Sequence, residues 1–284
     1  MEIDLKLIRR EFKNPMQIGT SLVSNKDFLE GTIDNFDFEL SVLTGLHQES
    51  FEQAKNQLSN YLDGSIQKSK LYPSVLFAIE AWENLKTKDL VVPNEVQQNA
   101  LLLKPDLNEL TKLRSLGFKS FKLKIARSES ANDISTFLKN LEGDEKIRLD
   151  GNQKMTPDQL VELLEKLKNY WSLIDYIEEP FKDHLQTANW SHTVPLALDE
   201  SLSYFLSTSL PSHIKNVVLK PSLYGFKKSL ILIESLNSRN IVVTLSSSFE
   251  GPIGLSAIFA LAHFQNTHHP NPAGLDTLKY FKTI

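Results

Sequence analysis

The alternation of hydrophobic and polar residues changes near Pro93, and this change divides the chain into two regions. Before Pro93, apolar residues alternate with charged ones over residues 33–40, which predicts a strand. Apolar residues then recur at helical spacing over residues 48–62 and 73–85, which predicts two helices. Residues 1–93 are therefore predicted to form a small α+β domain.

Polar stretches within this first region predict where its strands end. Ser-Asn-Lys at 24–26 and Glu-Gly-Thr at 30–32 interrupt the alternation and contain residues that favour turns. Both stretches are expected to be loops. The last residues of the chain, 276–284, follow the final predicted strand and are expected to pack on this domain.

After Pro93, short apolar strands alternate with amphipathic helices. Strands are predicted, in chain order, at residues 99–103, 118–125, 146–150, 174–178, 194–199, 217–220 and 241–246, with a short eighth strand at 273–275. Thr156-Pro157-Asp158-Gln159 has the residues of a capping box, with proline at the first helical position. Alternating units of this length predict a parallel sheet, and eight strands would close a (β/α)8 barrel over residues 94–275. A doubly wound sheet is not favoured, because no glycine-rich turn follows an early strand.

One predicted strand carries two lysines where a core strand would be apolar. Lys122 and Lys124 alternate with Phe121 and Leu123, so both ammonium groups point to the same face. Burying ammonium groups is costly unless anions meet them, so an anionic group is expected near that face. On this stretch alone, an edge strand with a solvated lysine face is the simpler interpretation.

Further charged residues stand at the ends of the strands that follow. Asp150, Glu178 and Asp199 end three consecutive predicted strands, and Lys220 ends the next one. In a barrel, residues at the carboxyl ends of the strands converge and carry the chemistry. Desolvated carboxylates repel one another unless a cation lies between them, and an all-oxygen site suits Mg²⁺. Each acid alone is a common turn or cap residue, so the prediction depends on the whole set.

Composition narrows the choice of partners. The 284 residues carry a net charge of −4 and no concentrated basic run, so a nucleic acid is not an expected partner. The absence of cysteine excludes disulfides and thiolate metal sites. No signal-like segment opens the chain and no apolar run is long enough to span a bilayer, so no membrane association and a cytoplasmic location are expected.

The charged strand ends lie in short motifs whose order resembles the enolase superfamily, in its muconate-lactonising subgroup. The motifs are Lys122-Leu123-Lys124, Arg148-Leu149-Asp150-Gly151-Asn152, Ile177-Glu178-Glu179-Pro180, Leu198-Asp199-Glu200-Ser201 and Lys220-Pro221. Within the subgroup, the segments 246–250 and 274–277 resemble the o-succinylbenzoate synthases. The resemblance implies an α/β fold: an enolase-like (β/α)8-type barrel over residues 94–275 with an N-terminal α+β capping domain over residues 1–93.

The resemblance also implies a role for each charged residue. Three carboxylates are the implied ligands of Mg²⁺, with Mn²⁺ as a substitute: Asp150, Glu178 and Asp199. Lys124 is the implied acid and base, Lys122 tunes it, and Lys220 lies on the opposite face of the substrate. Four polar residues are candidates for binding the substrate, a small-molecule carboxylate: Arg148, Asn152, Ser246 and Ser247.

The implied activity is that of a carbon–oxygen lyase of menaquinone biosynthesis. It is the Mg²⁺-dependent syn dehydration of 2-succinyl-6-hydroxy-2,4-cyclohexadiene-1-carboxylate to o-succinylbenzoate, in which Lys124 removes the α-proton and then protonates the departing hydroxide. An N-succinylamino acid racemase, with Lys220 as a second base, is the nearest alternative. A dipeptide epimerase is less favoured, because Asp276 stands alone where an Asp-x-Asp pair is expected.

Cycloisomerisation of a muconate is a further alternative within the same chemistry. Two non-enzymatic interpretations also remain. One is a barrel that binds a metal and an anion without turning the anion over. In the other, the lysines and Arg148 neutralise the acids as interior salt bridges without any metal.

Overall fold

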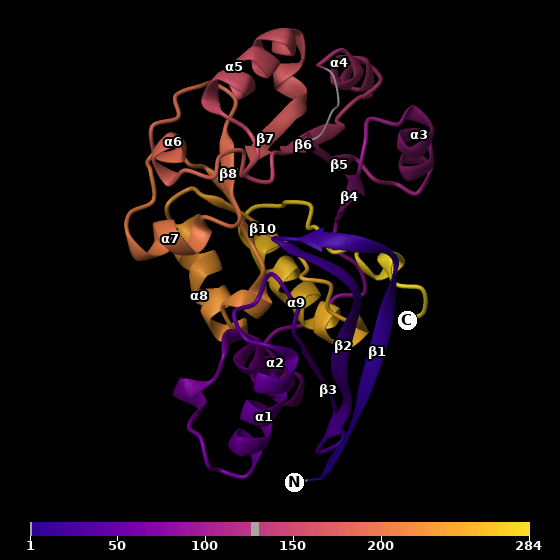
Figure 1. The fold of residues 1–284 in the computed structure, drawn as a ribbon, viewed down its shortest axis with the longest axis vertical. Helices are drawn as coiled ribbons and strands as arrows, with labels where there is room; N and C mark the ends of the chain where they lie inside the picture. Colours follow the sequence, from indigo (N-terminus) through magenta and orange to yellow (C-terminus); the bar gives the residue numbers. More distant parts are fainter. Residues whose placement is uncertain (1, 126–130) are drawn as a thin grey trace.

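The computed structural model describes residues 2–125 and 131–284. An antiparallel three-stranded sheet and two helices form the N-terminal part, and a parallel seven-stranded sheet with surrounding helices forms the rest (Figure 1). The N-terminal elements are β1 (Ile3–Ile18), β2 (Ser21–Ile33), β3 (Phe36–Ser41), α1 (Phe51–Leu62) and α2 (Pro73–Thr87). The two predicted helices are thus confirmed.

The prediction of loops at 24–26 and 30–32 is wrong, because both stretches lie inside β2. This strand pairs with β1 on one side and β3 on the other, so cross-strand pairing outweighs the local turn preference of its polar residues. Gly31 continues the strand, and a Cβ there would lie 1.9 Å from the carbonyl oxygen of Asp4. The glycine permits a close backbone approach and does not turn the chain.

The second part alternates strands and helices, as predicted. In chain order its elements are β4 (Asn99–Leu102), α3 (Leu107–Ser115), β5 (Ser120–Lys124), α4 (Ala131–Lys139), β6 (Lys146–Asp150), α5 (Pro157–Lys166), β7 (Ile174–Glu178), α6 (His184–Ala188), β8 (Leu196–Leu198), α7 (Leu202–Ser207), β9 (Asn216–Leu219), α8 (Phe226–Asn237), β10 (Val242–Leu245) and α9 (Pro252–His268). Each strand from β4 to β10 pairs in parallel with its neighbour in sequence. The predicted capping box at Thr156 is present.

The eighth strand is reduced to two single bridges. Ala273 bridges Gln98 beside β4, and Gly274 bridges Ser246 beside β10. Backbone hydrogen bonds run from Asn99 N to Ala273 O (2.9 Å) and from Gly274 N to Leu245 O (2.8 Å). The segment therefore joins the two edges of the sheet and closes the ring. Prolines at 270 and 272 precede it and cannot donate to a ladder, which keeps this pairing short.

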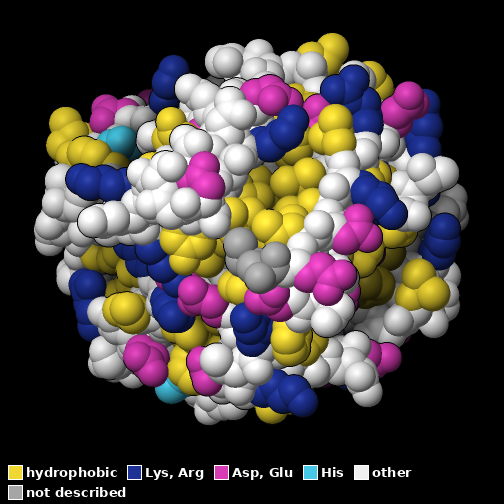
Figure 2. Space-filling model, turned by 90° about the horizontal axis from the view of Figure 1, so that it is seen from below, with side chains coloured by type: hydrophobic (Ala, Val, Ile, Leu, Met, Phe, Trp, Pro, Cys, Tyr) yellow, Lys and Arg dark blue, Asp and Glu magenta, His cyan; other side chains and the backbone are white. Residues whose placement is uncertain are grey.

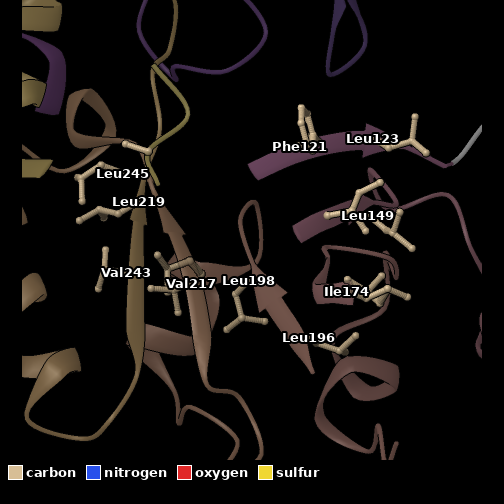
Figure 3. Packing of buried hydrophobic residues seen from close by; sticks show 14 of the residues in the cluster. Phe121, Leu123, Leu149, Ile174, Leu196, Leu198, Val217, Leu219, Val243 and Leu245 are labelled. Atoms are coloured by element: carbon tan, nitrogen blue, oxygen red, sulfur yellow. The ribbon is translucent and has the colours of Figure 1, made fainter. Parts of the chain in front are cut away.

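The strands present different residues to their two faces. Figure 3 shows side chains of one face, among them Phe121, Leu149, Val217 and Val243. These residues are buried in a single hydrophobic cluster that includes helix residues. Since side chains alternate along a strand, the residues between them, beginning with Lys122, point to the interior of the ring. The outer face thus makes the core and leaves the inner face for polar groups.

The C-terminal residues return to the N-terminal sheet. Phe281 forms an isolated bridge with Phe12 of β1, and their rings stack with centroids 4.7 Å apart. Lys282 N donates to Glu11 O at 2.9 Å. The C-terminus accordingly lies beside β1 (Figure 1).

The surface seen in Figure 2 carries side chains of both charge signs, interspersed with apolar ones. Neither sign dominates that face, in line with the small net charge. Within the described part of the chain, no helix has the length and apolar character needed to cross a bilayer.

Candidate active site

Charged residues mark the carboxyl ends of five neighbouring strands. Lys124, Asp150 and Glu178 are the last residues of β5, β6 and β7, while Asp199 and Lys220 directly follow β8 and β9. Lys124 is the register partner of Asp150, and Asp150 is that of Glu178. Parallel pairing therefore brings to one end of the ring residues that are far apart in the sequence.

Two lysines bind the three acids of this set. Lys122 Nζ lies 3.0 Å from Asp150 Oδ2 and 2.6 Å from Glu178 Oε1. Lys220 Nζ donates to Asp199 Oδ1 at 2.6 Å. Because β5 has a paired strand on each side, the interpretation of an edge strand with solvated lysines is wrong.

Burial and the neighbouring charges shift the pKa values of Lys122 and Glu178. Burial works against the charged form of Lys122, but Asp150, Glu178 and Asp199 outweigh it and raise the Lys122 pKa above its ordinary value. Burial raises the pKa of Glu178 to about 7, where the other two acids add to the rise and Lys122 opposes it. A buried carboxylate held in this way gains from any further positive charge nearby.

The acids supply the donor set of a hard divalent cation. Asp150 and Glu178 are each 1% exposed, and both direct an oxygen to Lys122 Nζ. Among the described residues, no group of three acids or histidines is already arranged as a set of metal ligands. Oxygens of Glu178 and Asp199 instead accept hydrogen bonds from Lys122 and Lys220. Carboxylate oxygens from neighbouring strand ends are the ligand type that Mg²⁺ prefers, so the residues fit this ion in chemistry and in location.

Glu179 holds Asp199 in place, a role the sequence did not reveal. Its Oε2 accepts hydrogen bonds from Asp199 N (2.7 Å) and from both N and Oγ of Ser201 (3.2 and 2.9 Å). The residue is 2% exposed and has φ of +38°. Such backbone conformations in non-glycine residues cluster at functional sites. Its place beside Glu178 in the motif was the only signal in the sequence.

Arg148 has a structural role, which corrects its assignment as a substrate ligand. It is 1% exposed, and its guanidinium donates to the carbonyl of Pro272 (2.7 Å) and to the side chains of Asn271 (2.6 Å) and Asn99 (3.0 Å). These partners flank the bridges that close the ring. A substrate carboxylate would have to displace them, so Arg148 closes the barrel instead.

Replacing Arg148 with alanine is expected to lower the free energy of unfolding by about 3–5 kcal/mol, because each neutral acceptor that loses its donor costs about 1–3 kcal/mol. Arg9→Ala is the matched control, since its pair with Asp27 is exposed and should contribute only about 0–1 kcal/mol. Urea unfolding followed by circular dichroism measures both. Equal effects of the two substitutions would contradict the structural role of Arg148.

The remaining substrate-binding candidates lie at the same end of the ring. Ser246 follows β10 on the interior face, two residues after Thr244. The Ser247 hydroxyl is already used, since it donates to Glu250 Oε2 (2.7 Å) and accepts from Phe249 N (2.9 Å). Asn152 donates its backbone N–H to Asp150 Oδ1 (3.0 Å) and so fixes that carboxylate. Ser246 is thus the serine better placed for a ligand.

A cavity of about 960 Å³ lies at the other end of the ring, and its lining does not include Asp150, Glu178 or Asp199. Its lining contains Ser120, Lys146, Asn216 and Val242, each the first residue of its strand. Barrel enzymes carry their chemistry at the carboxyl ends of the strands, so this cavity is not the candidate active site.

Comparison with known proteins decides the family. Residues 106–207 match a family model described as enolase C-terminal domain-like. An o-succinylbenzoate synthase of Pasteurella multocida (strain Pm70) is 30% identical over 262 residues, which cover 84% of this chain and 77% of that protein. The chain belongs to the enolase superfamily. It is an enzyme of this superfamily, as its motifs predict, and not a barrel that only binds a metal and an anion.

Two solved structures of the enolase superfamily share the fold. The o-succinylbenzoate synthase of Thermosynechococcus elongatus BP-1, solved with Mg in its active site, has a TM-score of 0.79 at 18% identity and covers 99% of this chain and 94% of its own. An N-succinyl Arg/Lys racemase of Bacillus cereus ATCC 14579 has a TM-score of 0.77 at 18% identity, with 99% and 89% covered. A synthase and a racemase share the fold, so the fold alone does not separate their reactions.

Proposed function

We propose that this enolase-superfamily enzyme catalyses the Mg²⁺-dependent syn dehydration of 2-succinyl-6-hydroxy-2,4-cyclohexadiene-1-carboxylate to o-succinylbenzoate, a step of menaquinone biosynthesis. The observation that carries the proposal is the order of charges across the strand ends: ammonium groups from β5, then three carboxylates, then the ammonium group of Lys220. The 30% identity to an o-succinylbenzoate synthase supports this reaction over others of the superfamily.

Lys124 is the proposed acid and base. It ends β5 beside Asp150, on the interior face where a bound carboxylate would present its α-carbon. The neutral amine removes the proton at C1 of the ring, and the electron pair passes into an enediolate. The resulting ammonium then protonates the hydroxyl at C6, which leaves as water as the ring becomes aromatic. Both transfers occur on one face of the ring, so a single group is enough.

The other charged groups bind and orient. Asp150, Glu178 and Asp199 are the proposed Mg²⁺ ligands, with Mn²⁺ as a substitute. When bound, the ion supplies positive charge that stabilises the enediolate. Lys122, which contacts two of the acids, positions them, and Lys220 is a fixed cation on the opposite side of the substrate.

An N-succinylamino acid racemase is the second candidate. The observation that favours it is the presence of an amine on each side of the acids, Lys124 from β5 and Lys220 after β9. In 1,1-proton transfer one amine removes the α-proton, and the other delivers a proton to the opposite face. In that reaction Lys220 would be a second base and not a fixed cation.

The two candidates differ in the products of a simple assay. We expect the purified protein to convert the cyclohexadiene acid to o-succinylbenzoate with Mg²⁺, to lose this activity in EDTA, and to regain it when Mg²⁺ is restored. In D₂O, an N-succinylamino acid should show slow or no exchange of its α-proton by NMR. Fast exchange with racemisation, together with an untouched cyclohexadiene acid, would establish the racemase instead.

A further inference from the structure

Four buried charged residues lie on one face of the three-stranded N-terminal sheet. Arg10, Lys26, Glu30 and Glu39 are each at most 8% exposed. Arg10 is the register partner of Lys26, and Glu30 is that of Glu39, so each pair places like charges on neighbouring strands. Like charges directly opposite each other destabilise a sheet. Each charge therefore needs a partner of its own.

Arg10 and Glu30 satisfy each other. Arg10 Nη2 donates to Glu30 Oε2 at 2.8 Å, and its second terminal nitrogen donates to Oε1. The guanidinium passes over the ring of Phe28, 4.5 Å from its centroid. This bidentate pair is internal to the sheet. It leaves Lys26 and Glu39 to contact groups outside the sheet.

Lys26 binds the turn that follows β10. Its Nζ donates to the carbonyl oxygens of Ser248 and Phe249, both at 2.9 Å. Phe249 has φ of +60°, a conformation uncommon in residues other than glycine. One ammonium group thus holds two consecutive carbonyls of a strained turn. That turn begins two residues after Ser246, which faces the candidate active site.

Glu39 caps the helix that follows the same turn. Its Oε1 accepts from Gly251 N (2.7 Å) and its Oε2 from Gly254 N (2.9 Å). Gly251 is the N-cap of α9 and has no side chain to cap it. A carboxylate from β3 therefore satisfies free N–H groups at the positive end of the helix. A Cβ at either glycine would lie 2.7 Å from a Glu39 oxygen, so glycine permits this approach.

We propose that Lys26 and Glu39 are positioning residues, which hold residues 246–251 in the conformation that binds a carboxylate of the substrate. The inference rests on the proposed function, because it takes Ser246 and its neighbouring backbone as a substrate contact. Hydrogen bonds to defined carbonyls and amides fix one orientation of the N-terminal domain on the barrel, which apolar contacts alone would not do. A turn held before the substrate arrives loses less entropy on binding.

The variant Lys26→Met tests this inference, because it keeps the length of the side chain and removes the charged donor. We expect KM to rise about tenfold while kcat stays within about threefold, since the turn binds substrate and does not transfer protons. Amide hydrogen exchange should accelerate over residues 246–254 and stay unchanged in β5–β7. Affinity for Mg²⁺, measured by calorimetry, should not change.

Lys13→Met is the matched control, since Lys13 lies exposed on β1 next to buried Phe12. It should change neither KM nor exchange. Glu39→Gln provides a second variant if Lys26→Met does not fold. Its amide places an NH₂ group against an N–H of α9, so we expect faster exchange at the start of the helix and a similar rise in KM.

The possible results are distinguishable. Unchanged exchange over residues 246–254 would overturn the inference, as would faster exchange with an unchanged KM. If wild-type protein racemises N-succinylamino acids and leaves the cyclohexadiene acid untouched, the proposed function fails. The same comparison of exchange and KM is then made with the racemised substrate, and the same two results would overturn the positioning role.

Discussion

Replacing Lys124 with alanine is expected to reduce kcat for dehydration by about 10³–10⁴-fold. General acid–base catalysis typically accelerates a reaction by about 10²–10⁴-fold. We expect the upper part of this range here, because one amine acts first as base and then as acid. KM should change little, since the substrate carboxylate is held by other groups. Steady-state assay of o-succinylbenzoate formation measures both constants.

Two further variants separate proton transfer from charge. Lys124→Arg keeps a positive group near Asp150. Burial alone would raise the pKa of Asp150, but Lys122 and then Lys124 outweigh burial and lower this pKa. A guanidinium does not lose its proton at neutral pH, so this variant should be as inactive as the alanine variant. Lys119→Ala removes an exposed lysine that pairs with Asp144 at 2.9 Å and should retain wild-type turnover. Full turnover by either Lys124 variant would remove Lys124 from its assigned role.

Replacing Asp199 with asparagine is expected to weaken Mg²⁺ binding by at least about 100-fold. Substitution of residues that merely support metal ligands costs about 10–100-fold in affinity, and loss of a charged ligand should cost no less. Glu179 contacts the backbone N–H of Asp199, so the local fold should persist in the variant. Calorimetric titration of the purified proteins with MgCl₂ measures the change.

Asp144→Asn is the control for this substitution, because it removes an exposed carboxylate at the other end of the ring. It should bind Mg²⁺ as the wild type does. Should Asp199→Asn also bind Mg²⁺ with wild-type affinity, Asp199 would not be a ligand of the ion. Mg²⁺ binding too weak to measure in the wild type would instead make the acids salt-bridge partners of Lys122 and Lys220 only.

Most of the barrel could be predicted because its signals are local. The strands at 146–150 and 174–178 are stretches bounded by charged residues and turns, and the structure has the same bounds. The capping box at Thr156 requires only four consecutive residues. In each case the hydrophobic period and the cap residues agree with the final fold, so nothing in the tertiary structure overrides them.

The predictions that failed are those that tertiary contacts decide. Residues 24–26 look like a loop, yet they lie in β2, where Asn25 and Lys26 pair with Glu11 and Arg10 of β1. Arg148 is a candidate substrate ligand through the family resemblance alone. Its partners Asn99 and Asn271 are distant in the sequence, so no local pattern could show that its donors are already satisfied.

The sequence by itself determined the periodic strands and helices and the type and order of the charged groups that end the strands. Period and composition depend on neighbouring residues, which the sequence displays. Only the tertiary structure decided that Lys122 lies between two of the acids, that Glu179 fixes Asp199, and that Lys26 holds the turn after β10. Such contacts depend on pairing between distant segments, where distance and direction determine whether two charges stabilise each other.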